Sequence, residues 1–252
     1  MPSATTRESA QKKDRRRITR VYGSAIARTS RARIDATVLQ VAGMPVTHLP
    51  AALGPILDFL DMAGIAVFAL SGALLAAMKK QTIVTFVFFA VVTGVGGGTV
   101  RDLLIGAPVF WVHQNAILLI CIGAAFAVWL LPAGLWKGKA LLWLDAVGLA
   151  AYSTYGAAKG LAFGLAPLPA FAMGVVTGCL GGIIRDVLAN EPSNLLSAEL
   201  YVSCAGLSAA LYVGLTWGGV DPGLAAVVAA IAGFSLRGGA IWRGWALPSY
   251  ER

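Results

Sequence analysis

Two short segments place an arginine and an aspartate directly after glycines, inside long apolar runs. The first is TGVGGGTVRD at 93–102, and the second is TGCLGGIIRD at 177–186. A charge at the centre of a bilayer costs at least about 2.5 kcal/mol on insertion scales, so arginines at such a depth need partners or water. Polar groups placed there indicate a route for something hydrophilic rather than a lipid-facing surface.

Aspartates earlier in the chain are the candidate partners for these arginines. Asp61 precedes the first segment and Asp145 precedes the second, each near the start of an apolar run. We predict that Asp61 pairs with Arg101 near one mouth of a pore and that Asp145 pairs with Arg185 near the other. A structural ion pair that locks two helices is an equally good interpretation. Two further carboxylates are expected to cap or line the entrances: Asp102 and Asp186.

The glycines themselves predict a local change in helix geometry. Glycine weakens a helix by about 1 kcal/mol relative to alanine, so a run of them favours a kink or an unwound turn. Backbone without helical hydrogen bonds is tolerated at membrane depth only beside protein or water, which predicts an interior cavity and carbonyls free to bind a cation. Close helix packing through small residues is the alternative. The predicted kink and pore residues are Gly94, Gly96, Gly97, Gly98, Gly178, Gly181 and Gly182.

Other polar residues carry weaker signals. Hydroxyls that could offer oxygens to a permeant ion, or simply bond their own backbone, are Ser71, Thr93, Tyr155 and Thr177. No nucleophile elbow, zinc-protease motif or phosphate-loop lysine is present, so we expect no catalytic residue and no enzyme. The cysteines fall in apolar runs without metal-ligand spacing, so we expect no metal and no cofactor other than a permeant K⁺ or Na⁺.

The elements that would position these residues are membrane helices. The chain is 58% hydrophobic and only 13% charged, well outside the usual soluble balance. The net charge of +8 comes mostly from residues 1–43, which hold ten Lys and Arg against three acidic residues. That segment predicts a basic disordered tail, or a chain that truly begins near Met44, and gives no reason to expect nucleic acid as a partner.

Hydropathy predicts an all-α integral membrane protein with seven transmembrane helices, the second and fifth of them kinked. The predicted bounds are 57–78, 82–106, 114–131, 140–162, 167–189, 197–217 and 221–236. The last has a short apolar core and either lies flat or extends through GGAIW. Connections rich in Lys and Arg, such as 79–80 and 137–139, fall on one side, which predicts a multi-pass inner-membrane protein with a cytoplasmic C-terminus.

The chain also repeats itself at an offset of 84 residues without a gap. DMAGIAVFALSGA at 61–73 aligns with DAVGLAAYSTYGA at 145–157, and the two Arg-Asp segments align as well. Each copy contains three predicted helices, an odd number, so the copies have opposite orientations in the membrane. The predicted organisation is a tail at 1–43, repeats at 56–136 and 140–217, and a seventh helix with the C-terminal tail at 218–252.

The doubled pattern of Asp, Gly and Gly-Gly-x-x-Arg-Asp resembles the prokaryotic trimeric intracellular cation (TRIC) channel family, also known as a glycine transporter domain. The resemblance covers about 56–236. It implies an inverted three-plus-three repeat with a seventh helix, and a homotrimer in contact with membrane lipid. It further implies that each protomer has its own pore for K⁺ and Na⁺ between kinked second and fifth helices.

Three functions are compatible with these residues. The first is a passive monovalent cation channel. The second is a secondary transporter of a small solute such as glycine, working by alternating access through the same cavity. The third is a structural membrane protein that organises lipids or partners.

Overall fold

The computed structural model describes residues 54–132, 134, 139–192 and 200–247, all of which belong to one compact unit. The predicted basic tail lies outside the described residues. Within the described part, the regular structure is helical, as expected. The helices are α2 (Pro55–Met78), α3 (Ile83–Leu104), α4 (Asn115–Leu130), α5 (Ala140–Ala162), α6 (Pro167–Leu188), α7 (Val202–Trp217) and α8 (Pro222–Arg243).

The predicted bounds differ from the observed ones mainly at the last two helices. The sixth predicted helix begins at Val202, because Leu200 and Tyr201 precede it in a bend. The seventh continues to Arg243 and ends where Gly244 adopts a left-handed conformation, φ 69°. The interpretation that this helix extends through GGAIW is therefore confirmed, and the predicted end at 236 is too early, so that Arg237 lies within the helix.

Local sequence explains where several helices begin. Proline stands at the first turn of α2, α6 and α8, where its missing N–H costs nothing and its fixed φ favours helix. In α8 the Asp221 carboxylate accepts a hydrogen bond from the Leu224 N–H at 3.0 Å, which caps the helix.

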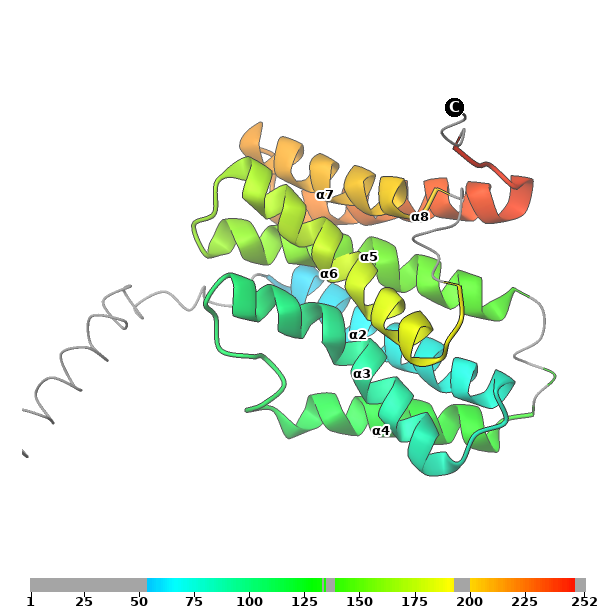
Figure 1. Ribbon diagram of the computed structural model, residues 1–252. Coiled ribbons are helices and arrows are strands. Elements are labelled where there is room, and N and C mark those ends of the chain that lie inside the picture. Colours follow the sequence, from blue (N-terminus) through cyan, green and yellow to red (C-terminus); the bar gives the residue numbers. More distant parts are fainter. Residues whose placement is uncertain (1–53, 133, 135–138, 193–199, 248–252) are drawn as a thin grey trace, which may run out of the picture. The chain divides into compact units, whose positions relative to one another are not determined.

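Successive helices run antiparallel (Figure 1). Helix α2 packs on α3, α4 and α5, while α5 packs on α6, α7 and α8, and α3 crosses α6. Helix α4 and the α7–α8 pair lie at opposite sides of the remaining four helices. We call the end with the connections 105–114, 163–166 and 218–221 the Arg101 end, and the end at which α2, α4 and α6 finish the Arg185 end.

Equivalent residues of the two repeats make equivalent contacts, which is the signature of an inverted repeat. A Cβ built on Gly64 lies 2.9 Å from the Tyr152 ring, and one built on Gly148 lies 3.0 Å from the Phe68 ring. An offset of 84 exchanges these two pairs. The pseudo-two-fold axis therefore passes through the contact between α2 and α5, and it relates one half of that contact to the other. The small residues at this contact let the two helices approach closely.

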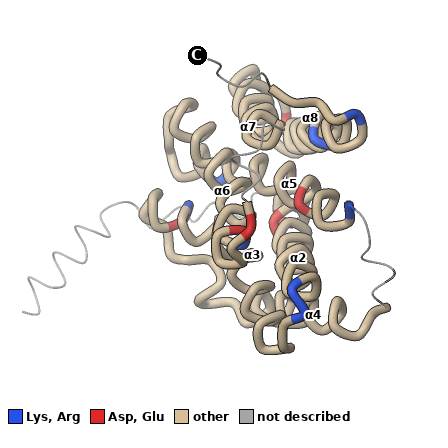
Figure 2. Tube along the Cα trace, turned by 45° about the vertical axis from the view of Figure 1, so that its right-hand side comes forward, with Lys and Arg blue, Asp and Glu red and all other residues tan. Residues whose placement is uncertain are grey.

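Four helices are long and apolar enough to cross a bilayer: α2, α3, α6 and α8. Helices α4 and α7 are apolar but have 16 residues each, which is about 24 Å at 1.5 Å per residue. Large apolar side chains such as Leu119, Leu168 and Trp217 are exposed on the outside of the bundle. Charged residues are sparse along the chain trace (Figure 2), so the outer surface suits lipid.

Helices α3 and α6 run without interruption through their glycines. The predicted unwound turns, and with them the carbonyls freed around Gly94–Gly96 and Thr177–Leu180, are therefore wrong. The interpretation of close packing, given as the alternative, is the one that the contacts fit. An unbroken helix can still bend, so a kink at these positions stays a prediction.

Candidate functional site

The Arg101 end holds a buried cluster of charges. Arg101 Nε donates a hydrogen bond to Asp102 Oδ1 at 2.8 Å, and Nη2 lies 2.8 Å from the same oxygen as an ion pair. Lys159, from the last turn of α5, lies 2.9 Å from the same oxygen. Both members of the Arg101–Asp102 pair are fully buried. Lys159 was not predicted to belong to this cluster, because the repeat offset pairs it with the uncharged Leu75.

Asp61 is a neighbour of this cluster and not the ion-pair partner of Arg101. It is nearly buried, and its electrostatic neighbours are Arg101, Lys159, the Tyr155 hydroxyl and Asp102. Its Oδ1 has no hydrogen-bond partner among the described residues. The predicted ion pair between Asp61 and Arg101 is therefore wrong. The guanidinium of Arg101 pairs with the adjacent Asp102 instead.

The connection at 105–114 folds over the Arg101 end of the site. The Phe110 N–H donates to Asp102 Oδ2 at 3.0 Å, and Trp111 Nε1 donates to Thr99 Oγ1 at 2.9 Å. The Phe110 ring lies 5.7 Å from the Arg101 guanidinium carbon and 5.8 Å from Lys159 Nζ. Aromatic faces favour cations at such distances, so this connection forms a cap on the cluster.

The Arg185 end holds the counterpart cluster. Arg185 Nη1 donates to Asp145 Oδ1 and to Ser71 Oγ, both at 2.9 Å, and Nε donates to Asp186 Oδ1 at 2.9 Å. The predicted contact between Asp145 and Arg185 is present. Ser71 comes from α2 of the other repeat, so this arginine ties the two halves together.

A second cation reaches the Arg185 end from outside the repeats. Arg237 of α8 is fully buried, lies with its guanidinium carbon 5.5 Å from the Tyr201 ring centroid, and acts electrostatically on Asp145. Each end therefore combines two carboxylates with two cations. Buried charges need such balance because an uncompensated one is costly.

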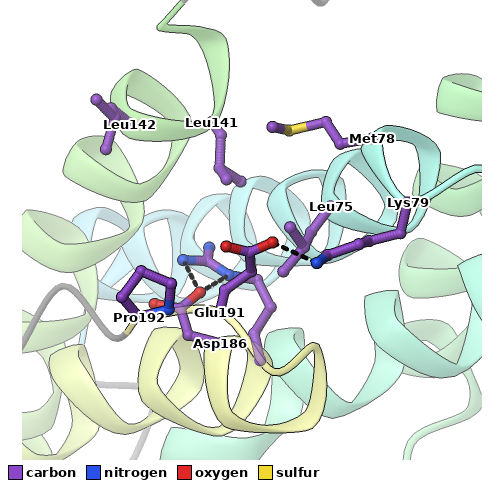
Figure 3. Close-up of a pocket in the computed structure, with 9 residues that line it drawn as sticks. Leu75, Met78, Lys79, Leu141, Leu142, Asp186, Glu191 and Pro192 are labelled. Carbon is purple, nitrogen blue, oxygen red and sulfur yellow. Dashed lines mark hydrogen bonds and ion pairs between the residues drawn. The ribbon is translucent and has the colours of Figure 1, made fainter.

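The Arg185 end opens to the outside through a pocket. At the Arg185 end a pocket of about 340 Å³ is lined by Arg185 and Asp186 together with apolar residues such as Leu75 and Leu141. An ion pair between Lys79 and Glu191, each about two-fifths exposed, lies across this pocket (Figure 3). At the Arg101 end, Lys159 occupies the place that Leu75 has in the other repeat.

Between the two clusters, α3 and α6 cross with their backbones in close approach. A Cβ on Gly97 would collide with the Thr177 carbonyl oxygen, and one on Gly181 would lie 2.7 Å from the Thr93 carbonyl oxygen. These are again equivalent contacts of the two repeats. Only glycine permits the crossing, which brings two carbonyl groups to the helix interface.

The other predicted glycines differ in which neighbours their Cα positions contact. A Cβ on Gly98 would lie 2.7 Å from the Phe110 ring, and one on Gly182 would lie 2.7 Å from the Tyr201 hydroxyl and 3.0 Å from Asp145. Gly94 packs on α2 and α4, and Gly178 packs on α5. Gly96 meets only the end of the Ile184 side chain, at 3.2 Å.

The predicted hydroxyls lie in the interior. Thr93 and Ser71 are fully buried, Tyr155 stacks 5.1 Å from the Arg101 guanidinium carbon, and the Thr177 hydroxyl donates to the Met173 carbonyl at 2.5 Å. Thr93 Oγ1 has no hydrogen-bond partner among the described residues. Tyr152, from α5, donates to the Gly94 carbonyl at 3.0 Å.

Searches of known sequences give the chain a family. A family model described as glycine transporter matches it twice, at 58–133 and 142–217, two stretches separated by the same 84 residues as the repeat. A membrane protein of Vibrio cholerae, described as UPF0126, is 43% identical over 59% of this chain, and the chain spans 63% of that relative's length. The inner membrane protein YadS of Escherichia coli K12 is 39% identical over 58% of this chain and 72% of its own.

Solved structures give the same answer. The TRIC trimeric intracellular cation channel orthologue from Rhodobacter sphaeroides is 40% identical and superposes with a TM-score of 0.71, covering 76% of this chain and all of that one. A prokaryotic TRIC channel crystallised in 0.5 M KCl is 31% identical, with a TM-score of 0.69 over 76% of this chain and 98% of its own. None of these proteins is described as an enzyme.

Proposed function

The chain belongs to the prokaryotic TRIC family, whose repeat the glycine transporter model matches twice, and on that premise we propose that it is a cation channel. The pathway runs inside each protomer, between α3 and α6, from the charge cluster at the Arg101 end to the cluster at the Arg185 end. K⁺ and Na⁺ are the proposed permeant ions.

The observation that carries this proposal is a series of buried polar atoms with hydrogen-bonding capacity left over. Asp61 Oδ1 lies at the Arg101 end, Thr93 Oγ1 at the helix crossing, and Asp145 Oδ2 at the Arg185 end. Thr93 is eight residues from Arg101, about 12 Å along the axis of α3. Buried polar groups are normally bonded, so unbonded oxygens at successive depths favour a route for a hydrated ion over a purely structural core.

The chemistry of these oxygens favours monovalent ions. Ca²⁺ takes 6–8 oxygen ligands, among them carboxylates, and Mg²⁺ demands near-ideal octahedral geometry. Here Asp102, Asp145 and Asp186 each pair with arginine or lysine, Asp61 keeps an oxygen without a hydrogen-bond partner among the described residues, and the crossing offers neutral oxygens from hydroxyls and carbonyl groups. Such neutral oxygens bind K⁺ or Na⁺ weakly enough for the ion to leave again.

The close crossing of Gly97 and Gly181 corresponds to a closed pathway. Conduction in this scheme requires α3 and α6 to separate by a small distance, which would expose the carbonyls of Thr93 and Thr177 to the ion. The pocket beside Arg185 and Asp186 would be one vestibule, and the cap at 105–114 would cover the other.

Assembly and orientation follow the same premise. We propose a homotrimer in the inner membrane, each protomer with its own pore, because the solved relative from Rhodobacter sphaeroides is described as trimeric. We propose that the Arg185 end is cytoplasmic, because Lys79, Lys80, Lys139 and the C-terminus of α8 lie there. Membrane lipid would surround the exposed apolar side chains.

Single-channel recording from the purified protein in a planar bilayer tests the proposal. A channel passes ohmic unitary currents whose reversal potential follows the K⁺ gradient. The alternative, a small-solute carrier, predicts saturable uptake of labelled glycine into liposomes and no unitary current; the solved relatives, described as cation channels, give it no support. Protein that moves neither K⁺ nor glycine would contradict both and leave a structural role.

A further inference from the structure

A second hollow, separate from the charge clusters, lies at the Arg185 end. It is a groove of about 430 Å³ between the end of α2, the start of α3 and the end of α4. Its lining residues are Leu74, Ala77, Met78, Lys80, Gln81, Phe86, Val128, Trp129 and Leu131. Its size falls within the range of small-molecule sites, and its walls are apolar except at one end. We name it the Lys80 groove.

The polar end of the Lys80 groove carries a cation without a counter-charge. Lys79 is paired with Glu191, whereas Lys80 has no ion pair among the described residues and is exposed. Its backbone has a positive φ of 54°, and its N–H bonds the Ala77 carbonyl at 2.9 Å, so the position of the residue is fixed by a tight turn. The adjacent Gln81 lines the same end, and its side-chain amide nitrogen, which has two N–H groups, donates to the Lys79 carbonyl at 3.0 Å.

The apolar end extends into the depth of the bilayer. Leu74 lies four residues before Met78, the last residue of α2, which is about 6 Å along the helix. Trp129 forms one wall, is 46% exposed, and packs edge-on against Phe86 with ring centroids 5.0 Å apart. Indoles favour the membrane interface, so the groove begins at headgroup level and continues beside the hydrocarbon.

These features point to one class of ligand. We propose that the Lys80 groove binds an anionic phospholipid, with the phosphate on Lys80 and Gln81 and an acyl chain along Phe86, Val128 and Trp129. The positive charge at the headgroup end and the apolar walls beneath it complement such a molecule. This site is distinct from the ion pathway, and its occupancy is measured without recording flux.

Fluorescence quenching of Trp129 by lipids with brominated acyl chains tests the proposal. The protein is reconstituted in phosphatidylcholine bilayers that contain either brominated phosphatidylglycerol or brominated phosphatidylcholine. The signal of Trp129 is the difference between the wild type and Trp129→Phe. We expect phosphatidylglycerol to quench this component at a lower mole fraction than phosphatidylcholine does. One lysine near an anionic lipid corresponds to about a fivefold preference.

Variants separate the site from general attraction to the membrane. Lys80→Gln and Gln81→Glu should each remove the preference for phosphatidylglycerol, and Lys80→Arg should keep it. Arg243→Gln is the matched control, because Arg243 lies at the same end of the bundle but outside the groove. Each variant is used only if it elutes as the wild type does in size-exclusion chromatography.

Three results would overturn the inference. Equal quenching by both lipids would leave no role for the headgroup charge. A preference that survives both Lys80→Gln and Gln81→Glu would place the anion elsewhere. No quenching of Trp129 by either lipid would mean that protein, such as a second copy of the chain, covers the groove.

Discussion

At the scale of single residues, the molecule depends on balancing charges that lie away from water. The chain keeps Arg101, Arg185 and Arg237 fully buried, and each lies in a cluster with carboxylates. Removing one member of a buried set leaves its partner uncompensated, whereas an exposed pair is solvated and screened. Loss of one carboxylate charge should therefore lower the stability of the protein far more in a buried set than in an exposed pair.

Asp102→Asn tests the buried set. The carboxylate bonds both Arg101 and Lys159, so its loss should lower the free energy of unfolding by about 3–5 kcal/mol. Glu191→Gln is the matched control, and the exposed Lys79–Glu191 pair should account for no more than about 1 kcal/mol. Thermal unfolding in detergent measures both. Similar midpoints for the two variants would contradict the assigned importance of the cluster.

Lys159→Gln tests how charge at the Arg101 end affects permeation. Without the lysine, the cluster keeps two carboxylates against Arg101, and the local concentration of cations should rise. Conductance should increase, and the increase should be larger at about 0.01 M salt than at 1 M, where the Debye length falls from about 30 to 3 Å. Arg243→Gln, away from both clusters, should leave conductance unchanged. A lower conductance for Lys159→Gln would contradict this role.

The residues of one cluster could be predicted further than those of the other. Asp145 and Arg185 are in contact as predicted. Asp145 lies near the start of α5 and Arg185 near the end of α6, and these two helix ends are on the same side of the bundle. Asp61 does not bond Arg101, since Asp102 forms ion pairs with both Arg101 and Lys159. The lysine comes from a helix of the other repeat, and comparison of the repeats gives no warning of it because its counterpart is Leu75.

At the scale of helices, the glycines allow close approach rather than unwinding. Propensity alone predicted a break in α3 and α6, but packing of their buried glycine faces against neighbouring helices supports helix even where glycine weakens it. The spacing of Gly94 and Gly98 also fits a packing motif, and local sequence could not decide between the two. The deciding information is the partner helix, which contributes the carbonyls of Thr93 and Thr177.

Adjacent glycines of α3 provide a matched test of this packing. Gly97→Ala places a methyl group against the Thr177 carbonyl, where backbone must move, and should cost about 1–3 kcal/mol as overpacking does. Gly96→Ala meets only Ile184 Cδ1, which can turn aside, so it should leave stability unchanged or slightly higher. Thermal unfolding compares them, and K⁺ flux into liposomes should change in the first variant only. Equal behaviour of the pair would contradict the crossing.

At the scale of the whole molecule, the repeat could be predicted in full and the role of the last helix could not. The offset of 84 residues predicted two three-helix units, and the family model divides the chain at the same interval. Helix α8 has no counterpart within the repeats. Its short apolar core left open whether it lies flat, yet the helix continues through the two glycines to Arg243, and Arg237 is buried beside Tyr201.

Orientation in the membrane is tested with single cysteines at the two ends of the bundle. Gln114→Cys lies at the Arg101 end and Arg243→Cys at the Arg185 end, both exposed, and the native cysteines are buried. A membrane-impermeant maleimide added to intact spheroplasts should label Gln114→Cys and leave Arg243→Cys unlabelled. Labelling of Arg243→Cys alone would reverse the proposed sidedness.

The second cation of each cluster comes from a different part of the chain, which indicates how the fold evolved. Lys159 belongs to the second repeat, whereas Arg237 belongs to α8, outside both. An ancestor made of one three-helix unit, paired with an upside-down copy of itself, would have carried identical residues at its two ends. Gene duplication lets one copy carry lysine where the other has leucine, and fusion keeps the two copies in one chain. The seventh helix then supplies the second buried cation of the Arg185 end, which the repeats themselves do not provide.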